Sequence, residues 1–344
     1  MSYSRSMIRF IAFALFLFVA PVSAQTPNLP DSVRALIPRA EEEGSLHVYG
    51  ATLNPRQVRA FGKSFNDYYG TDIDFSMSGG LHSAKASEVA MAHRAGVPTG
   101  IDVFWTGLIS AMVETDALME IDWVGSYGAD DSLTMGRWGL RTHDGHQSLV
   151  TVNTTRVSAA DAPKTYTDLL DPKWRGRIAM PRSPYPWIAM SYALGEQETI
   201  DLVSGLVTQQ EPKMLARYAD IRARVLSGEF PIAIGTDIFS LKKRGAPVEH
   251  PDIDLLVLSS SGAFVLADAE HPAAATLWGL WAVSPEGQAT LEETRSYSLA
   301  ETPGTALNDY ASGRKVVHVP FDWRLENHDR LSETFLAILN NAEN

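Results

Sequence analysis

The chain has 344 residues, with 29 Lys and Arg against 41 Asp and Glu and a formal net charge of −12. This acidic balance excludes the basic footprint of a nucleic-acid-binding surface. The absence of cysteine excludes disulfides, thiolate zinc sites, thiol nucleophiles and a lipid-modified cysteine anchor. The length and the 45% hydrophobic content are typical of a globular protein with two domains.

Residues 1–24 have the pattern of a secretory signal peptide. Arg5 and Arg9 accompany an apolar run, and Val22-Ser23-Ala24 is a small-residue cleavage site. The alternative is a transmembrane anchor, but the uninterrupted core at 11–19 is shorter than the roughly 20 residues of a span. We therefore expect cleavage near Ala24 and export of a soluble protein to the periplasm.

Strand and helix patterns alternate through the next hundred residues. Ser45–Tyr49 predicts a buried strand, and Asn54 with Pro55 predicts the start of a helix that Gly70 ends. Further strands are expected at 72–75 and 101–105, and further helices after Ser78-Gly79-Gly80 and over 107–119. Such repetition is typical of parallel βαβ units, and so of an α/β sheet covered by helices.

The pattern changes at residues 121–146, which look irregular. Asp144-Gly145 predicts a tight hairpin turn that leads into a strand at 149–152. A second α/β set follows it. Its expected strands lie at 177–180, 231–234, 253–258 and 263–266. One helix is expected to begin near Thr165, and another at 285. Further helical patterns cover 186–227, 272–281 and 329–342.

The sequence carries no specific catalytic motif. The nucleophile elbow, the H-E-x-x-H zinc motif, the Walker A loop and a G-x-G-x-x-G after a strand are all absent. His143 and His146 are spaced as two possible metal ligands, but the Asp-Gly turn between them explains the motif more simply. We therefore expect no catalytic residue, no metal and no cofactor, with a secreted α/β hydrolase or lyase as an alternative.

The candidate ligand-binding residues lie on loops after predicted strands, where open α/β sheets bind their ligands. Ser78-Gly79-Gly80 either offers N–H groups to an anion or starts a helix, and Arg182 either pairs with an anion or is solvated. Trp105 and Trp187 either wall a pocket or pack in the core. The full expected set is Thr52, Ser78, Gly79, Gly80, Trp105, Thr106, Arg182, Tyr185, Trp187, Asp237 and Phe239.

Five segments share an order and spacing along the chain: 40–50, 65–70, 94–103, 166–180 and 271–288. Together they resemble the periplasmic solute-binding proteins of ABC importers, in the group that includes binders of ferric ion, phosphonates and thiamine. The resemblance implies an α/β protein with the type II periplasmic-binding-protein fold, in which two lobes flank a ligand cleft with two chain crossings. It places lobe one at 25–150 plus 265–344 and lobe two at 151–264.

The resemblance also implies a function. The protein would be a monomeric receptor, not an enzyme, that captures a small solute and delivers it to the permease subunits of an ABC transporter. In the ferric binders, adjacent tyrosines after the lobe-two strand ligate the iron, whereas Ile238 and Phe239 stand at the matching positions here. Fe(III) prefers anionic oxygen ligands. We therefore expect an organic or phosphorus-containing anion, with ferric iron and an aromatic or cationic ring as alternatives.

Overall fold

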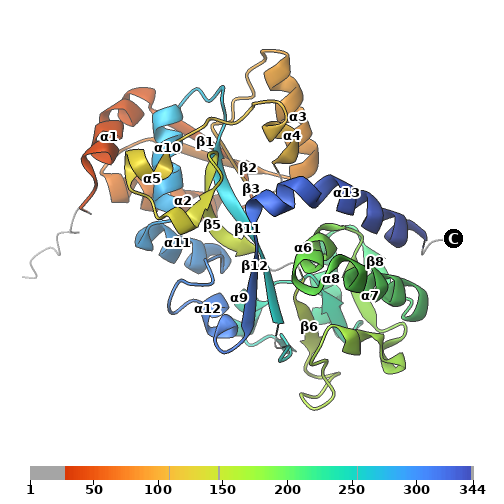
Figure 1. Cartoon of the computed structure of the whole chain (residues 1–344). Helices are drawn as coiled ribbons and strands as arrows, with labels where there is room; N and C mark the ends of the chain where they lie inside the picture. The colour runs from red at the N-terminus through yellow and green to blue at the C-terminus, as the bar shows by residue number, and fades with distance from the viewer. Residues whose placement is uncertain (1–27, 108, 146–147, 254, 342–344) are drawn as a thin grey trace, which may run out of the picture.

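The computed structural model describes residues 28–107, 109–145, 148–253 and 255–341, so the expected signal peptide lies outside the described residues. No helix within these ranges is long and apolar enough to cross a membrane. The described chain forms two sheets, each with its own helices and core (Figure 1). We call the half around the larger sheet the first lobe and the other half the second lobe.

The first lobe is built on a seven-stranded sheet of order β2-β1-β3-β11-β5-β4, with β12 paired to β11. Its strands are β1 (Ser45–Gly50), β2 (Asp74–Gly79), β3 (Val103–Thr106), β4 (Thr134–Met135), β5 (Gly139–Gly145), β11 (Leu255–Val265) and β12 (Lys315–Val319). Its helices are α1 (Asp31–Glu43), α2 (Pro55–Tyr69), α3 (His82–Arg94), α4 (Ser110–Val113), α5 (Trp123–Tyr127), α10 (Pro272–Ala282), α11 (Pro285–Arg295) and α12 (Ala306–Ala311), with a 3-10 turn at Asp131–Leu133.

The second lobe is built on a five-stranded sheet of order β10-β6-β9-β7-β8. Its strands are β6 (Val150–Asn153), β7 (Ile178–Pro181), β8 (Lys213–Leu215), β9 (Ile232–Ile234) and β10 (Val248–Glu249). Its helices are α6 (Tyr185–Leu194), α7 (Glu196–Gln209), α8 (Tyr218–Leu226) and α9 (Phe239–Lys243), with 3-10 turns at Thr167–Leu170 and Pro172–Trp174.

Local sequence signals set several helix ends as expected. The Asn54 side chain accepts hydrogen bonds from the N–H groups of Arg56 and Gln57, and the Gln57 side chain accepts one from the Asn54 N–H, which makes a full capping box. Gly70 ends the same helix with a left-handed φ of 71°. Ser284 caps α11 ahead of Pro285, as its sequence predicts.

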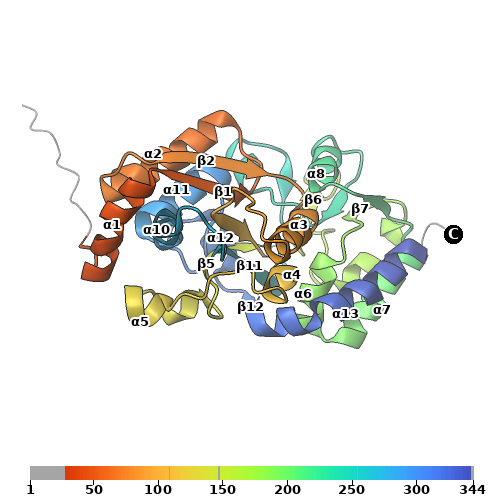
Figure 2. The ribbon, with the colours of Figure 1, turned by 90° about the horizontal axis from the view of Figure 1, so that it is seen from above.

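The chain crosses between the lobes from β5 to β6 and returns from β10 to β11. The last helix, α13 (Phe321–Asn340), then lies along α6 and α7 of the second lobe (Figures 1 and 2). It begins beside the first lobe, where Phe321 stacks on Phe264 with ring centroids 6.1 Å apart. Leu331, Phe335 and Leu339 are buried in the core of the second lobe. Both lobes therefore contribute packing to this one helix.

Several sequence expectations are wrong in detail. The segment 121–146 is not irregular, because it contains the buried strand β5. Asp144-Gly145 does not form a hairpin turn: both residues pair with β11, whereas β6 belongs to the other sheet. The two strands expected at 253–258 and 263–266 are the single strand β11. The three serines between them, Ser259–Ser261, are buried within this strand.

Three helix expectations also change. The helix expected over 107–119 is reduced to α4, and the pattern over 186–227 divides into α6, α7 and α8 with β8 between them. Near Thr165 the chain forms a 3-10 turn, although Thr165 and Asp168 do cap each other. At the C-terminus, α13 begins eight residues before the expected start at 329.

Candidate functional site

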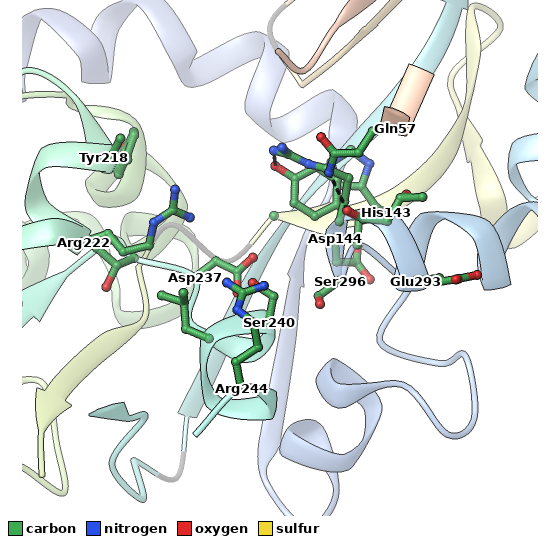
Figure 3. A pocket seen from close by; sticks show the side chains of 18 residues that line it. Gln57, His143, Asp144, Tyr218, Arg222, Asp237, Ser240, Arg244, Glu293 and Ser296 are labelled. Carbon is green, nitrogen blue, oxygen red and sulfur yellow. Dashed lines mark hydrogen bonds between the residues drawn. The ribbon is translucent and has the colours of Figure 1, made fainter. Parts of the chain in front are cut away.

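Two adjoining pockets lie between the lobes, and four residues line both of them: His143, Tyr218, Arg295 and Tyr297. We call the larger one, of about 560 Å³, the charged pocket (Figure 3). It is further lined by Gln57, Asp144, Gly145, Ala219, Arg222, Gly235, Thr236, Asp237, Ser240, Leu241, Arg244, Glu293, Thr294 and Ser296. We call the smaller one, of about 350 Å³, the aromatic pocket; it is further lined by Ala51, Gly80, Leu81, His82, Trp105, Thr106, Gly107, Ser183, Tyr185 and Ser261.

Three arginines reach the charged pocket from both lobes. Arg222 on α8 and Arg244 after α9 are exposed, and neither side chain has an ion pair or hydrogen bond within the described residues. Arg295, the last residue of α11, donates from Nη2 to the Tyr297 hydroxyl at 2.9 Å. Two guanidinium groups on the second-lobe side therefore remain available to a ligand.

Three carboxylates, Asp144, Asp237 and Glu293, line the same pocket. Asp144 is buried and already accepts hydrogen bonds from Arg141 at 3.1 Å and from the N–H of Ala300 at 2.9 Å. Asp237 accepts a hydrogen bond from the N–H of Phe239 at 3.0 Å. Glu293 extends away from the arginines in Figure 3. The second lobe thus presents two guanidinium groups and the Asp237 carboxylate to the pocket, which leaves one positive charge in excess on this side.

The aromatic pocket has a different lining. Trp105 forms part of it while staying 2% exposed, and its Nε1 donates to the Thr142 hydroxyl at 2.8 Å. Tyr185 and Tyr297 add two more rings, and Leu81 adds an apolar side chain that is 79% exposed. No carboxylate lines this pocket in the part of the chain that the structure describes. The pocket is therefore suited to an uncharged group with apolar faces.

His82 contributes to the aromatic pocket as a neutral ring. Burial lowers the pKa of His82 below its usual value, more than a hydrogen bond to the Gly50 carbonyl raises it. Because that carbonyl can only accept, His82 Nε2 carries the proton at 3.1 Å from it. Nδ1 then accepts from the Thr106 hydroxyl at 2.9 Å. Both ring nitrogens are therefore engaged within the protein.

Tyr218 stands at the junction of the two pockets. Burial raises the pKa of Tyr218 to about 12. In the metal-free protein the phenol therefore stays protonated at neutral pH.

One cluster within the described residues has the composition of a metal site: Asp144, Glu301 and His318. Its geometry is that of an ion-pair network instead. Arg141 lies among the three side chains, at 3.1 Å from Asp144, 3.1 Å from Glu301 and 3.2 Å from His318 Nδ1. The guanidinium supplies the positive charge that the carboxylates need, and it would repel a cation.

Five of the expected ligand-binding residues line the two pockets: Gly80, Trp105, Thr106, Tyr185 and Asp237. They come from the carboxyl ends of β2, β3, β7 and β9, which is where the sequence placed them. Thr52 and Gly79 lie just behind this edge. Thr52 offers its carbonyl to Arg295 Nη1 at 3.5 Å, and a Cβ on Gly79 would come within 2.5 Å of the Gly50 carbonyl oxygen.

The remaining four do not line either pocket. Ser78 lies within β2 and bonds His47 Nε2 at 2.8 Å, so it does not start α3, whose N-cap is Leu81. Trp187 is 1% exposed in the core of the second lobe. Phe239 is buried against His250 and Tyr310, and Arg182 is exposed outside the pocket linings. Trp187 and Phe239 are thus core residues, because their helices turn these large rings inward.

Sequence reasoning missed most of the charged pocket. Arg222 lies on α8 between Arg217 and Arg224, and of the three it alone has no acidic residue three or four positions away. In the structure Arg217 pairs with Asp220 and Arg224 with Glu229, whereas Arg222 faces the pocket without a partner within the described residues. The missed set is His143, Tyr218, Arg222, Arg244, Arg295 and Tyr297.

Solved structures share this architecture at low sequence identity. Iron-bound HitA from Pseudomonas aeruginosa is 19% identical, with a TM-score of 0.68 over 87% of this chain and 99% of that one. AfuA from Actinobacillus pleuropneumoniae, with exogenous fructose-6-phosphate bound, is 19% identical, with a TM-score of 0.67 over 86% and 99%. The Atu4243-GABA receptor is 16% identical, with a TM-score of 0.66 over 86% and 97%. The fold is therefore the two-lobed type II periplasmic-binding-protein fold, as expected.

A comparison of the sequence with protein families identifies the family of this chain. Residues 147–324 match the family of bacterial extracellular solute-binding proteins, which is more than half of the chain. The protein belongs to this family, and the resemblance found in the sequence is confirmed.

Proposed function

We propose that this protein is a periplasmic receptor that captures a small organic or phosphorus-containing anion between its lobes and delivers it to the permease of an ABC transporter. The observation that carries the proposal is the charged pocket, where Arg222 and Arg244 have no partner within the described residues. A guanidinium group binds phosphate or carboxylate through paired, charge-assisted hydrogen bonds. Arg295 offers a third guanidinium group from the first lobe.

An anion in this position would contact both lobes at once. It would then stabilise the arrangement in which Arg222 and Arg244 approach Arg295, and the permease would recognise that closed state. We propose first-lobe bounds of 28–145 plus 255–319 and second-lobe bounds of 148–253 plus 321–341, since these follow the two sheets and the packing of α13. The pairing of β11 within the larger sheet supports placing 255–264 in the first lobe in this proposal.

The solute leaves the protein chemically unchanged in this proposal. Steady multiple turnover of any ligand of the cleft would contradict it. A gene for an ABC permease and one for its ATPase beside this gene would support the import role. The proposed working form is the monomer, which light scattering with and without ligand tests.

The ligand class can be tested by a thermal-shift screen of organic anions, phosphate esters, phosphonates and ferric salts. A ligand at 100 times its Kd stabilises the native protein by about 2.7 kcal/mol. We expect the largest shifts from anions. A large shift from ferric salts alone would contradict the proposal, and the apolar pair at Ile238 and Phe239 argues against such a shift.

The site can be tested with two variants of the same helix. Arg222→Gln removes the proposed anion contact, whereas Arg224→Gln removes an arginine that pairs with Glu229. We expect Arg222→Gln to weaken binding of the best anion from the screen about tenfold or more, and Arg224→Gln to leave it within twofold. Equal affinities for the two variants would place the anion elsewhere.

A further inference from the structure

We infer that the solute has two chemically different ends: a terminal anionic group in the charged pocket, and an uncharged, ring-bearing body in the aromatic pocket. This inference rests on the proposed function and specifies its ligand class. Its starting point is that the two pockets are one continuous site. His143, Tyr218, Arg295 and Tyr297 line both pockets, so a single molecule can reach from one into the other.

The charged pocket accounts for one end only. Its unpaired guanidinium groups, Arg222 and Arg244, both come from the second lobe, and neither lines the aromatic pocket. Ser240 adds a hydroxyl group to the same lining. This group of donors matches the oxygens of a phosphate, phosphonate or carboxylate. A compact anion would be satisfied here and would leave the aromatic pocket unused.

The aromatic pocket does not suit a second anion. The only arginine in its lining is Arg295, which is shared with the charged pocket and is already bonded to Tyr297. His82 is neutral, because burial lowers its pKa, and both of its ring nitrogens are engaged. Its rings and the exposed Leu81 instead offer apolar surface. Placing a charge there without a partner would be costly.

A ring can stack in the aromatic pocket. His143 and Tyr297 are stacked on one another at 4.5 Å and 10°, next to the edge of Trp105, so their orientations are already fixed. The faces of aromatic side chains attract the apolar faces of aryl and sugar rings. Ser183 and Ser261 supply hydroxyl groups for a polar substituent. Leu81 would lose its water contact when a ring and the second lobe cover it, which adds a favourable hydrophobic contribution.

The test compares the binding of ring-bearing anions with the binding of the compact anion alone and of the ring alone. Isothermal calorimetry on the full mature protein would use phenyl phosphate and glucose 6-phosphate against inorganic phosphate, and phenylacetate against acetate. We expect the best ring-bearing anion to bind at least tenfold more tightly than its compact anion, and phenol alone to give no measurable heat. Which of the three ring-bearing probes binds best then distinguishes a phosphate ester from a carboxylate.

The aromatic pocket is tested separately by Leu81→Ser, with Met91→Ser as the matched control. Leu81 is the N-cap of α3 and serine is a favourable N-cap, so the variant is expected to fold. Met91 is on the same helix and 65% exposed, and it lines neither pocket. Leu81→Ser should weaken the ring-bearing anion about fivefold and leave the compact anion unchanged. Met91→Ser should change neither.

The outcomes separate the two claims. If the compact anion binds as tightly as every ring-bearing one, or if Leu81→Ser has no effect on the ring-bearing anion, the two-ended ligand is overturned while the anion receptor stands. If no anion of either kind binds, the proposed function itself fails and the present inference with it.

Discussion

The two walls of the cleft hold their side chains in opposite ways. On the first-lobe wall, Trp105 donates to Thr142, His143 stacks on Tyr297, and Arg295 donates to Tyr297. On the second-lobe wall, Arg222 and Arg244 are exposed and have no partner within the described residues. These first-wall side chains are thus held by one another before a ligand arrives, whereas the two second-wall arginines have no such contacts within the described residues.

The two walls therefore contribute to the binding free energy in different ways. The first-lobe wall supplies a shape that costs no further ordering, since its side chains already hold one another. Each second-wall arginine gives up side-chain entropy of up to about 2 kcal/mol when it binds an anion. In return, its charge-assisted hydrogen bonds contribute about 1.5–3 kcal/mol each relative to water. Changes in the first wall should therefore alter stability as well as affinity, and changes in the second should alter affinity alone.

The largest effect is expected from the tryptophans. Trp105→Ala and Trp187→Ala should each lower the free energy of unfolding by about 3–5 kcal/mol, because each leaves a cavity in a lobe core. Denaturant unfolding measures this loss. At a temperature where both variants remain folded, only Trp105→Ala should also weaken ligand binding, because Trp187 lines neither pocket. A comparable loss of affinity in Trp187→Ala would reverse the core assignment of that residue.

The second-wall arginine Arg244 should give the next largest effect. Arg244→Gln should weaken anion binding by about 1.5–3 kcal/mol, which is about 10- to 100-fold, and should leave the melting temperature of the free protein unchanged. Calorimetry and a thermal melt measure the two quantities. A clear fall in the melting temperature of the free variant would show that Arg244 also stabilises the fold, which contradicts the expectation that the second-wall arginines affect affinity alone.

Tyr297→Phe probes the fixed wall more gently. The substitution keeps the ring that stacks on His143 and removes the hydroxyl that accepts from Arg295. We expect losses of about 1 kcal/mol in both the free energy of unfolding and the binding free energy, the latter being about fivefold in Kd. A loss of affinity with no change in stability would contradict the difference between the two walls, since Arg295 would then affect binding alone, as is expected of Arg222.

The smallest effect is a pH dependence that belongs to the first wall. The folded-state pKa of His82 is lowered by burial, so the unfolded chain takes up a proton first as the pH falls through about 6.5. The free energy of unfolding should therefore decline from pH 7.5 to pH 5.5, and His82→Gln should flatten this decline. Urea titrations across that range measure it, and identical pH slopes for the two proteins would contradict the assignment.

Local chemistry explains which parts of this molecule can be predicted from sequence. The capping box at Asn54 and the cap at Ser284 depend on neighbouring residues only, and both were predicted. Gly80 and Tyr185 were found because the carboxyl ends of parallel strands meet at one edge of a sheet. The continuity of β11 was missed, because Ser260 is buried only through its hydrogen bond to Asp144, more than a hundred residues away.

Arg222 was missed for a different reason. Asp220 lies three residues after Arg217 and four before Arg224, whereas Arg222 has no acidic residue three or four positions away. This spacing distinguishes Arg222 as an unpaired arginine, but only the fold places it at the pocket.

The packing of α13 has a practical consequence for dissecting the protein. The family match ends at residue 324, four residues into this helix. A recombinant fragment cut at the borders of that match would omit Leu331, Phe335 and Leu339, which complete the core of the second lobe. Expressed alone, it would leave an apolar groove along α6 and α7 open to solvent and prone to aggregation. The unit of sequence that identifies the family is therefore shorter than the unit that folds.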